Sequence, residues 1–306
     1  MDAQQARVEL ASRLFRVLET NAVAFCAVGD TREFPHCIPS DLDLVVDVDD
    51  AAKLPRLLFD LVRENGAKLV QVLRHERQAW YFILAGFGPD GRPWFLHPDF
   101  SCGYCEKARP LLDAVQLLAE CRPALESNGD SKGFTVPAPA SEFIYYFLKK
   151  TEKQELNERQ ARHLSAIYGE DPTGAAAQLR RFWCEADVER ITRAGAGGDW
   201  SDVRAMLRHL RATIHAARPI SWAARLHELP RVIGRISRRT GLWVVFLGPD
   251  GSGKSTILNR AAAEIAPAFR RTQIFHLRAR LLPHENGGPV VDPHGHPPHH
   301  AVTSLA

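Results

Sequence analysis

The sequence lacks the features that mark several special classes of protein. No uninterrupted apolar run approaches the roughly 20 residues of a membrane helix, and the N-terminus MDAQQARVEL has neither the basic nor the apolar region of a signal peptide. Six cysteines in 306 residues do not make a disulfide framework, and the pair Cys102 and Cys105 has no second ligand pair at zinc spacing. We therefore expect a cytoplasmic protein with reduced thiols and no membrane span.

The chain also lacks a strong excess of either charge. It carries 39 Lys and Arg residues against 36 Asp and Glu, a formal charge of +3, so bulk electrostatics gives no argument for a nucleic-acid partner. Hydrophobic residues make up 45% of the sequence, which excludes a largely disordered or fibrous protein. At about 100 to 200 residues per domain, this length predicts two or three domains.

Residues 1–108 have the pattern of an α+β domain. Short apolar runs bounded by turn residues alternate with segments whose apolar residues recur at helical spacing. The pattern predicts helices over 5–21 and from Asp49 or Asp50 to Val62, and strands at 23–28, 42–46, 68–73, 79–85 and 93–97.

Residues 109–240 are predicted to form a helical domain and connector, because the strand signal vanishes after about residue 110. Between 201 and 240 nine Arg stand against one Asp and one Glu. Two interpretations of this basic stretch stay open: a face for an acidic partner, or a solvated helical connector. The predicted helices are 141–150, 157–168, 174–184, 201–216 and 221–237.

The strongest motif begins the third segment, 241–306. Residues 248–255 read GPDGSGKS, which fits G-x-x-x-x-G-K-[ST] between a predicted strand at 242–247 and a predicted helix from Thr256 to Ile265. Glycines let successive N–H groups turn toward phosphate oxygens, and the helix N-terminus adds about half a positive charge. Lys254 is then expected to contact the β- and γ-phosphates, and Ser255 to ligate Mg²⁺. The predicted nucleotide-binding residues are Gly248, Asp250, Gly251, Ser252, Gly253, Lys254, Ser255 and Thr256.

The wording GPDGSGKST followed by an apolar helix resembles the thymidylate-kinase-like branch of P-loop kinases. The resemblance implies ATP as donor, a nucleotide or another small molecule as acceptor, and Lys254 as a catalytic residue. The 66 residues of 241–306 are only about two βαβ units, so we expect an incomplete, truncated P-loop domain. Its last residues look like a mid-domain loop of longer proteins encoded among bacterial surface-polysaccharide genes.

A second constellation consists of carboxylates. Asp41 and Asp43 are two positions apart in a strand-like run, so their side chains project from the same face while Leu42 and Leu44 point to the core. Like charges this close repel, and binding of Mg²⁺ gives a reason to tolerate them. Asp99 is expected to end the strand that contains 94–96, and we predict that these three aspartates hold the metal.

This constellation resembles the nucleotidyltransferase (polymerase β-like) fold over residues 5 to about 105. That pattern has a Gly-Ser or similar turn, Asp-x-Asp on one strand and a third Asp on another, and it implies that two Mg²⁺ ions align an α-phosphate with an acceptor hydroxyl. Here the turn is Gly29-Asp30, which puts negative charge where triphosphate should lie, and Pro98 interrupts the strand before Asp99. Lys149, Lys150 and Lys153 are candidates to reach a triphosphate, or form an ordinary charged helix face.

The sequence therefore predicts an α+β nucleotidyltransferase-like domain, a helical domain and an incomplete α/β P-loop NTPase domain. The expected function is Mg²⁺- and ATP-dependent phosphotransfer to a small-molecule acceptor, a nucleotide or a sugar, with an NTP as the other partner. Two alternatives stay open: nucleotidyl transfer alone beside an inert P-loop fragment, and a non-catalytic nucleotide-binding protein. The acceptor, the preferred base and the oligomeric state are not indicated.

Overall fold

The computed structural model describes residues 2–38, 41–76, 78–126, 129–220, 241–249, 251–269 and 271–274. The chain divides into two units, Met1–Ala268 and Phe269–Ala306. Several sequence predictions lie outside the described residues: the helix at 221–237, Asp250, and the last residues of the third segment.

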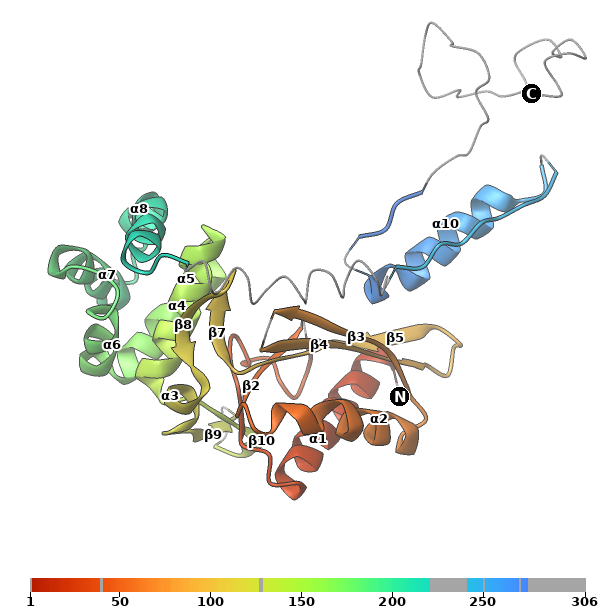
Figure 1. Cartoon of the computed structure of the whole chain (residues 1–306), viewed down its shortest axis with the longest axis horizontal. Coiled ribbons are helices and arrows are strands. Elements are labelled where there is room, and N and C mark those ends of the chain that lie inside the picture. Colours follow the sequence, from red (N-terminus) through yellow and green to blue (C-terminus); the bar gives the residue numbers. More distant parts are fainter. Residues whose placement is uncertain are drawn as a thin grey trace, which may run out of the picture. The chain divides into compact units, whose positions relative to one another are not determined.

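The N-terminal part of the first unit is a mixed sheet with two long helices against it (Figure 1). Its elements are α1 (Ala3–Thr20), β1 (Phe25–Ala27), β2 (Leu42–Val46), η1 (Ala51–Lys53), α2 (Leu54–Glu64), β3 (Lys68–Glu76), β4 (Ala79–Phe87), β5 (Pro93–Leu96) and β6 (Pro98–Ser101). The six-stranded sheet has the order β1-β2-β6-β4-β3, with β5 also pairing with β4. β2 and β6 run parallel, and the other pairs are antiparallel.

The sequence explains these elements locally. α1 begins after Asp2, whose side chain accepts from the backbone N–H of Gln5 in a capping box, and it buries Leu14 and Leu18 at helical spacing. In β2 the buried Leu44 alternates with the half-buried Asp43. The alternation puts Leu44 in the core and turns Asp43 to the other face of the sheet.

A cluster of phenylalanines anchors the loop that follows β1. Phe34 in this loop packs edge-on against Phe15 of α1, with ring centroids 5.6 Å apart, and against Phe134, at 5.3 Å. Phe25 of β1 stacks on Phe15 from another side. Because Phe34 is buried, its aromatic contacts hold the loop from Gly29 onward to the domain core and stabilise the conformation of that loop.

The strand-poor pattern expected after residue 110 is wrong for residues 109–136. Residues 103–136 hold β7 (Gly103–Glu106), β8 (Arg109–Asp113), α3 (Ala114–Leu118), β9 (Arg122–Leu125) and β10 (Ser131–Val136). They form two short antiparallel pairs, β7 with β8 and β9 with β10. Gly103 has φ +113°, and a Cβ there would lie 2.3 Å from the carbonyl oxygen of Leu112, so the β7–β8 pair requires glycine. The pairs are short, which leaves little periodicity to read in the sequence.

Helices dominate the described residues from 139 to 217. They are α4 (Pro139–Lys153), α5 (Glu158–Glu170), α6 (Pro172–Leu179), α7 (Glu185–Gly197) and α8 (Ser201–Ala217), gathered on one side of the β7–β8 pair in Figure 1. The helices predicted at 141–150, 157–168 and 201–216 are confirmed, α6 ends earlier than predicted, and α7 was not predicted. One cluster of buried apolar residues runs from Leu10 to Ile214, so sheet and helices share a core.

The described residues after 240 form α10 (Lys254–Ile265) and η2 (Ala266–Ala268). Residues 241–249 are neither strand nor helix, so the strand predicted at 242–247 is wrong, whereas the helix predicted over 256–265 is confirmed. The described residues therefore have a mixed α+β architecture, with one mixed sheet and several helices.

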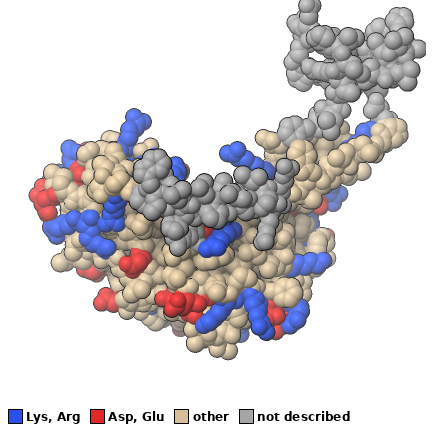
Figure 2. Space-filling view, viewed as in Figure 1, with Lys and Arg blue, Asp and Glu red and all other residues tan. Residues whose placement is uncertain are grey.

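Two global properties agree with the composition. No helix in the described part of the chain combines the length and apolar character of a membrane span. On the face drawn in Figure 2, basic and acidic side chains are interspersed.

The burial of Glu142 of α4 in the shared core can be tested by measuring how the free energy of unfolding depends on pH. Its side chain is buried, and burial raises its pKa to about 7, an effect only partly offset by Arg122, 3.3 Å away. Because the folded state holds this proton more tightly than the unfolded chain, it contributes stability that is present below about pH 4.5 and is lost as the pH rises through 7. We expect Glu142→Gln to remove this part of the decline, about 3 kcal/mol at most, in urea unfolding followed between pH 4.5 and 8. An unchanged slope would contradict this assignment.

Glu152 tests how α8 is attached to α4. Its side chain is 1% exposed and accepts from Arg211 Nε at 3.0 Å and pairs with His215 Nε2 at 3.0 Å. Glu152→Gln leaves the Arg211 guanidinium without its carboxylate, and we expect a loss of about 3 kcal/mol in the free energy of unfolding. The matched control is Glu158→Gln, which removes an exposed partner of Arg204 and should cost below about 1 kcal/mol. Equal losses of unfolding free energy for Glu152→Gln and Glu158→Gln in chemical denaturation would contradict the expectation that the buried pair stabilises the fold more than the exposed pair.

Candidate functional site

The site is built on the one parallel strand pair of the described sheet. Asp43 of β2 and Asp99 of β6 are direct partners across this pair, so their side chains project on the same face at neighbouring positions, about 4.8 Å apart along the hydrogen-bonding direction. The expectation that Asp99 ends the strand containing 94–96 is wrong. Pro98 instead begins a separate strand, β6, where the missing N–H of a first residue is tolerated.

The third predicted carboxylate, Asp41, precedes β2 and takes different partners. Tyr81 is the register partner of Asp99 on β4, and its hydroxyl donates to Asp41 Oδ1 at 3.0 Å. His97 Nδ1 lies 3.7 Å from the same oxygen, and its ring is stacked on that of Tyr81 with centroids 5.7 Å apart. Burial lowers the pKa of His97, and Asp41 offsets part of that effect.

Lys149 of α4 supplies a cation to the carboxylate pair. Its Nζ donates to Asp43 Oδ2 at 2.7 Å, and the two side chains are 19% and 26% exposed. Burial acts to lower the pKa of Lys149, but the carboxylates of Asp43 and Asp99 outweigh it and the pKa lies above its ordinary value. The ammonium is therefore charged at neutral pH and neutralises part of the negative charge on this face.

Gly29 lies next to the Asp43 carboxylate. Its φ is +94°, and a Cβ built on it would lie 3.5 Å from Asp43 Oδ2, so a side chain here would combine a strained backbone with contact to the carboxylate. The backbone N–H of Val28 donates to the Asp43 carbonyl at 3.0 Å. The turn after β1 and the Asp43 side chain thus form one continuous surface.

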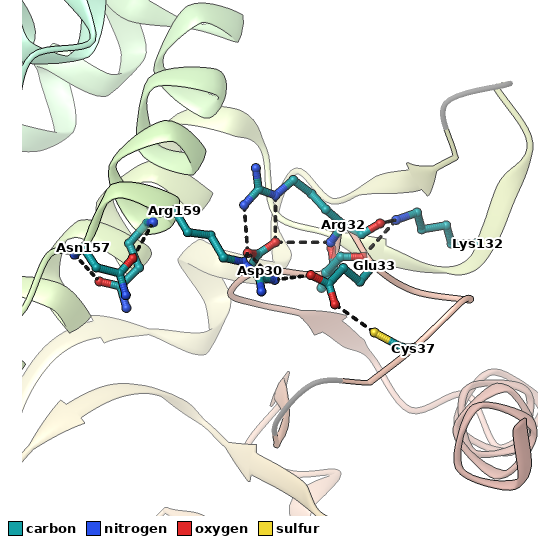
Figure 3. Close-up of polar contacts among 9 residues, drawn as sticks. Asp30, Arg32, Glu33, Cys37, Lys132, Asn157 and Arg159 are labelled. Atoms are coloured by element: carbon teal, nitrogen blue, oxygen red, sulfur yellow. Dashed lines mark hydrogen bonds and ion pairs between the residues drawn. The ribbon is translucent and has the colours of Figure 1, made fainter. Parts of the chain in front are cut away.

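Asp30 does not leave a free negative charge beside this surface (Figure 3). Arg32 donates to the Asp30 carboxylate through Nε and Nη2, each at 2.8 Å. Arg159 of α5 contacts the same carboxylate at 3.2 Å. Burial alone would raise the pKa of Asp30, but Arg32 and His163 hold it well below its usual range. Two guanidinium groups therefore compensate the negative charge that Asp30 places in this turn.

The same cluster fixes the turn from two other directions. Lys132 of β10 donates to the carbonyls of Thr31 and Arg32 at 2.9 and 3.0 Å. His163 of α5 is buried, and burial lowers its pKa to about 4, so the imidazole is neutral at pH 7. Loop, β10 and α5 are therefore tied together around Gly29.

The phosphate loop predicted at 248–255 is described apart from Asp250. Gly251 and Gly253 both have φ +78°, the left-handed conformation that the glycines of such a turn supply. α10 begins at Lys254, whose Nζ donates back to the carbonyl of Gly248 at 2.6 Å and to that of Pro249. Ser255 and Thr256 follow in the first turn of the helix.

The surroundings of this loop differ from an embedded strand–loop–helix. Trp243 is 82% and Leu247 89% exposed, and α10 buries none of its residues against the described chain. Within the described residues the predicted nucleotide-binding residues thus have the local backbone of a phosphate loop without a sheet around them.

The three predicted aspartates do not converge on one point. Among the residues that the structure describes, no group of three or more His, Cys, Asp or Glu side chains is arranged to hold a metal ion. The structure brings Asp43 and Asp99 together and directs Asp41 to Tyr81. Sequence reasoning missed the roles of Tyr81 and Arg159, which have no motif: one is an aromatic residue in an apolar strand and the other a helix arginine among many.

Comparison with known proteins adds no relative. No protein-family model matches the chain, and the search of curated proteins gives no match.

Proposed function

We propose that the first unit transfers a nucleotidyl group from a nucleoside triphosphate to a hydroxyl of a small-molecule acceptor. The observation that carries this proposal is the register of Asp43 opposite Asp99 on adjacent parallel strands, with the Gly29 turn against Asp43. Paired carboxylates beside a turn that accepts close approach suit a metal-assisted reaction at phosphorus. The likeness to the nucleotidyltransferase fold noted in the sequence points the same way.

The donor set fits a divalent cation. Carboxylate oxygens are the ligands that Mg²⁺ prefers, and the ammonium of Lys149 already balances the charge of Asp43 and Asp99. Asp43 and Asp99 would hold Mg²⁺, whereas Asp41 accepts a hydrogen bond from Tyr81. When bound, the ion would withdraw electron density from the phosphoryl oxygens and stabilise the negative charge that develops on them.

The residues of the chain have separate tasks in this reaction. The acceptor oxygen forms a bond to the α-phosphorus, the bond from that phosphorus to the bridging oxygen breaks, pyrophosphate leaves, and the hydroxyl proton passes to water. Gly29 lets the phosphates approach its backbone because it has no side chain. Arg32 and Arg159 cancel the charge of Asp30 beside that approach, and Tyr81 orients Asp41.

Nucleotide capture by residues 248–256 is a second candidate function, favoured by one observation. The ammonium of Lys254 lies on the loop carbonyls of Gly248 and Pro249, and Gly251 and Gly253 have the backbone of a phosphate cradle. A triphosphate would draw the ammonium from these carbonyls to its β- and γ-oxygens. ATP binding would then be the contribution of this segment, and phosphoryl transfer by it the stronger form of the hypothesis.

Nucleotidyl transfer is tested by substituting the carboxylate pair. We expect Asp43→Asn and Asp99→Asn each to lower Mg²⁺-dependent pyrophosphate release by at least about 100-fold, because each removes charge that holds the metal. The assay offers each of the four NTPs with a panel of sugar phosphates and polyols, water being the default acceptor. Asp90→Asn, at an exposed turn position beside Arg92, is the control and should release pyrophosphate at the wild-type rate. Folded protein whose pyrophosphate release is unaffected by both substitutions would rule out the carboxylate mechanism and leave a non-catalytic nucleotide-binding protein.

The second candidate is tested by calorimetric titration with ATP. Lys254→Ala should weaken ATP binding by about tenfold or more, because the ammonium contributes a charge-assisted contact to the triphosphate. Arg260→Ala, on the same helix and paired with Glu264, should leave the isotherm unchanged. A Lys254→Ala isotherm identical to that of the wild type means that this loop does not hold ATP.

A further inference from the structure

Lys149 is distinguished from the other lysines of its helix by what it contacts. Its Nζ lies 2.7 Å from Asp43 Oδ2. Lys150, the next residue, instead lies over the ring of Tyr146 at 4.8 Å, and burial together with Lys153 and Lys149 lowers its pKa to about 8. Of the lysines expected from sequence to reach a triphosphate, Lys149 is the one whose ammonium lies on a site carboxylate.

The carboxylates need this cation in the absence of metal. Asp43 and Asp99 are register partners on adjacent strands, and the Asp43 side chain is half-buried against Lys149 of α4. Like charges at this separation and partial burial destabilise the folded state unless a cation lies between them. The ammonium donates to Asp43, and Asp99 is the register partner of Asp43, so the cation lies beside the carboxylate pair.

We propose that Lys149 is an exchangeable counter-ion, which occupies the position of the divalent cation on Asp43 and Asp99 and is displaced when that cation binds. This inference rests on the nucleotidyl-transfer proposal, because it concerns the same carboxylates. The displaced ammonium is then free to meet the anionic nucleotide, so that cation binding and nucleotide binding favour one another. Lys149 is in this account a positioning residue that couples the two events.

The counter-ion account predicts opposite effects for two substitutions. Lys149→Met removes the competing charge and should tighten Mg²⁺ binding by about tenfold, while lowering the melting temperature of the metal-free protein. Lys149→Arg keeps the charge and binds carboxylates through a planar fork, so Mg²⁺ binding should be weaker than in the wild type. A lysine with a purely structural role would instead lose Mg²⁺ affinity in both variants.

The experiment is calorimetric titration of the full chain with MgCl₂, accompanied by thermal melting with and without Mg²⁺. Mg²⁺ is the probe because the chain has 13 histidines, which ligate transition metals but not Mg²⁺. Asp43→Asn assigns the heat to this site by abolishing it, and Lys150→Met is the matched control, expected to bind Mg²⁺ as the wild type does. Melting of Lys149→Met should rise with Mg²⁺ more than melting of the wild type.

The outcomes separate this inference from the function on which it rests. Wild-type and Lys149→Met proteins that bind Mg²⁺ equally, with the heat removed by Asp43→Asn, would overturn the counter-ion role and keep the cation site. Absence of Mg²⁺ binding in every protein, Lys149→Met included, would overturn the cation site and the inference together. If Lys149→Met does not fold, the Lys149→Arg titration decides: affinity equal to or above that of the wild type overturns the proposal.

Discussion

The parallel pairing of β2 with β6 is the constraint on which the rest of the site depends. It sets Asp43 opposite Asp99, and the alternation of each strand sends the neighbouring Leu44 and Phe100 into the core, where both are fully buried. A slip of one residue would bury the carboxylates and expose those apolar side chains. The apolar core therefore fixes the position of the charged pair, and the cost of the slip is the burial of two aspartates without water.

The charges around this pair are balanced by residues from the helices. Lys149 of α4 balances Asp43 and Asp99, while Arg159 of α5 joins Arg32 on Asp30. Both helices share a buried core with the sheet, so the positions of α4 and α5 beside the carboxylates are fixed by packing. The helical part of the chain thus completes the electrostatics of a site whose carboxylates come from strands.

Local pattern predicted much of the fold. α1, β2 and α2 followed from apolar spacing, and the opposite faces of Asp43 and Leu44 followed from alternation. β6 was missed because Pro98 was treated as an interruption, although a proline is tolerated at the first position of a strand. The strands β8, β9 and β10 were missed because each is four to six residues long and is stabilised by its pairing more than by its own sequence.

The sequence indicated the carboxylates of the candidate site, but it did not indicate most of the side chains that contact them. Asp-x-Asp and a nearby Gly turn are local signals, whereas the hydrogen bond from Tyr81 to Asp41 joins residues 40 positions apart and that from Lys149 to Asp43 joins residues 106 apart. Contacts at such separation depend on topology and leave no periodic trace in one sequence. For the same reason the compensation of Asp30 by Arg159 was not anticipated.

The most direct measurement of the central claim is a crystal structure of the full chain with Mn²⁺ and a non-hydrolysable nucleoside triphosphate, located by anomalous scattering. The account predicts an anomalous peak ligated by carboxylate oxygens of both Asp43 and Asp99, triphosphate oxygens on the same ion, and the Lys149 ammonium moved from Asp43 to the nucleotide. A structure without a peak at this pair, with Lys149 still bonded to Asp43 and the nucleotide elsewhere, would contradict it.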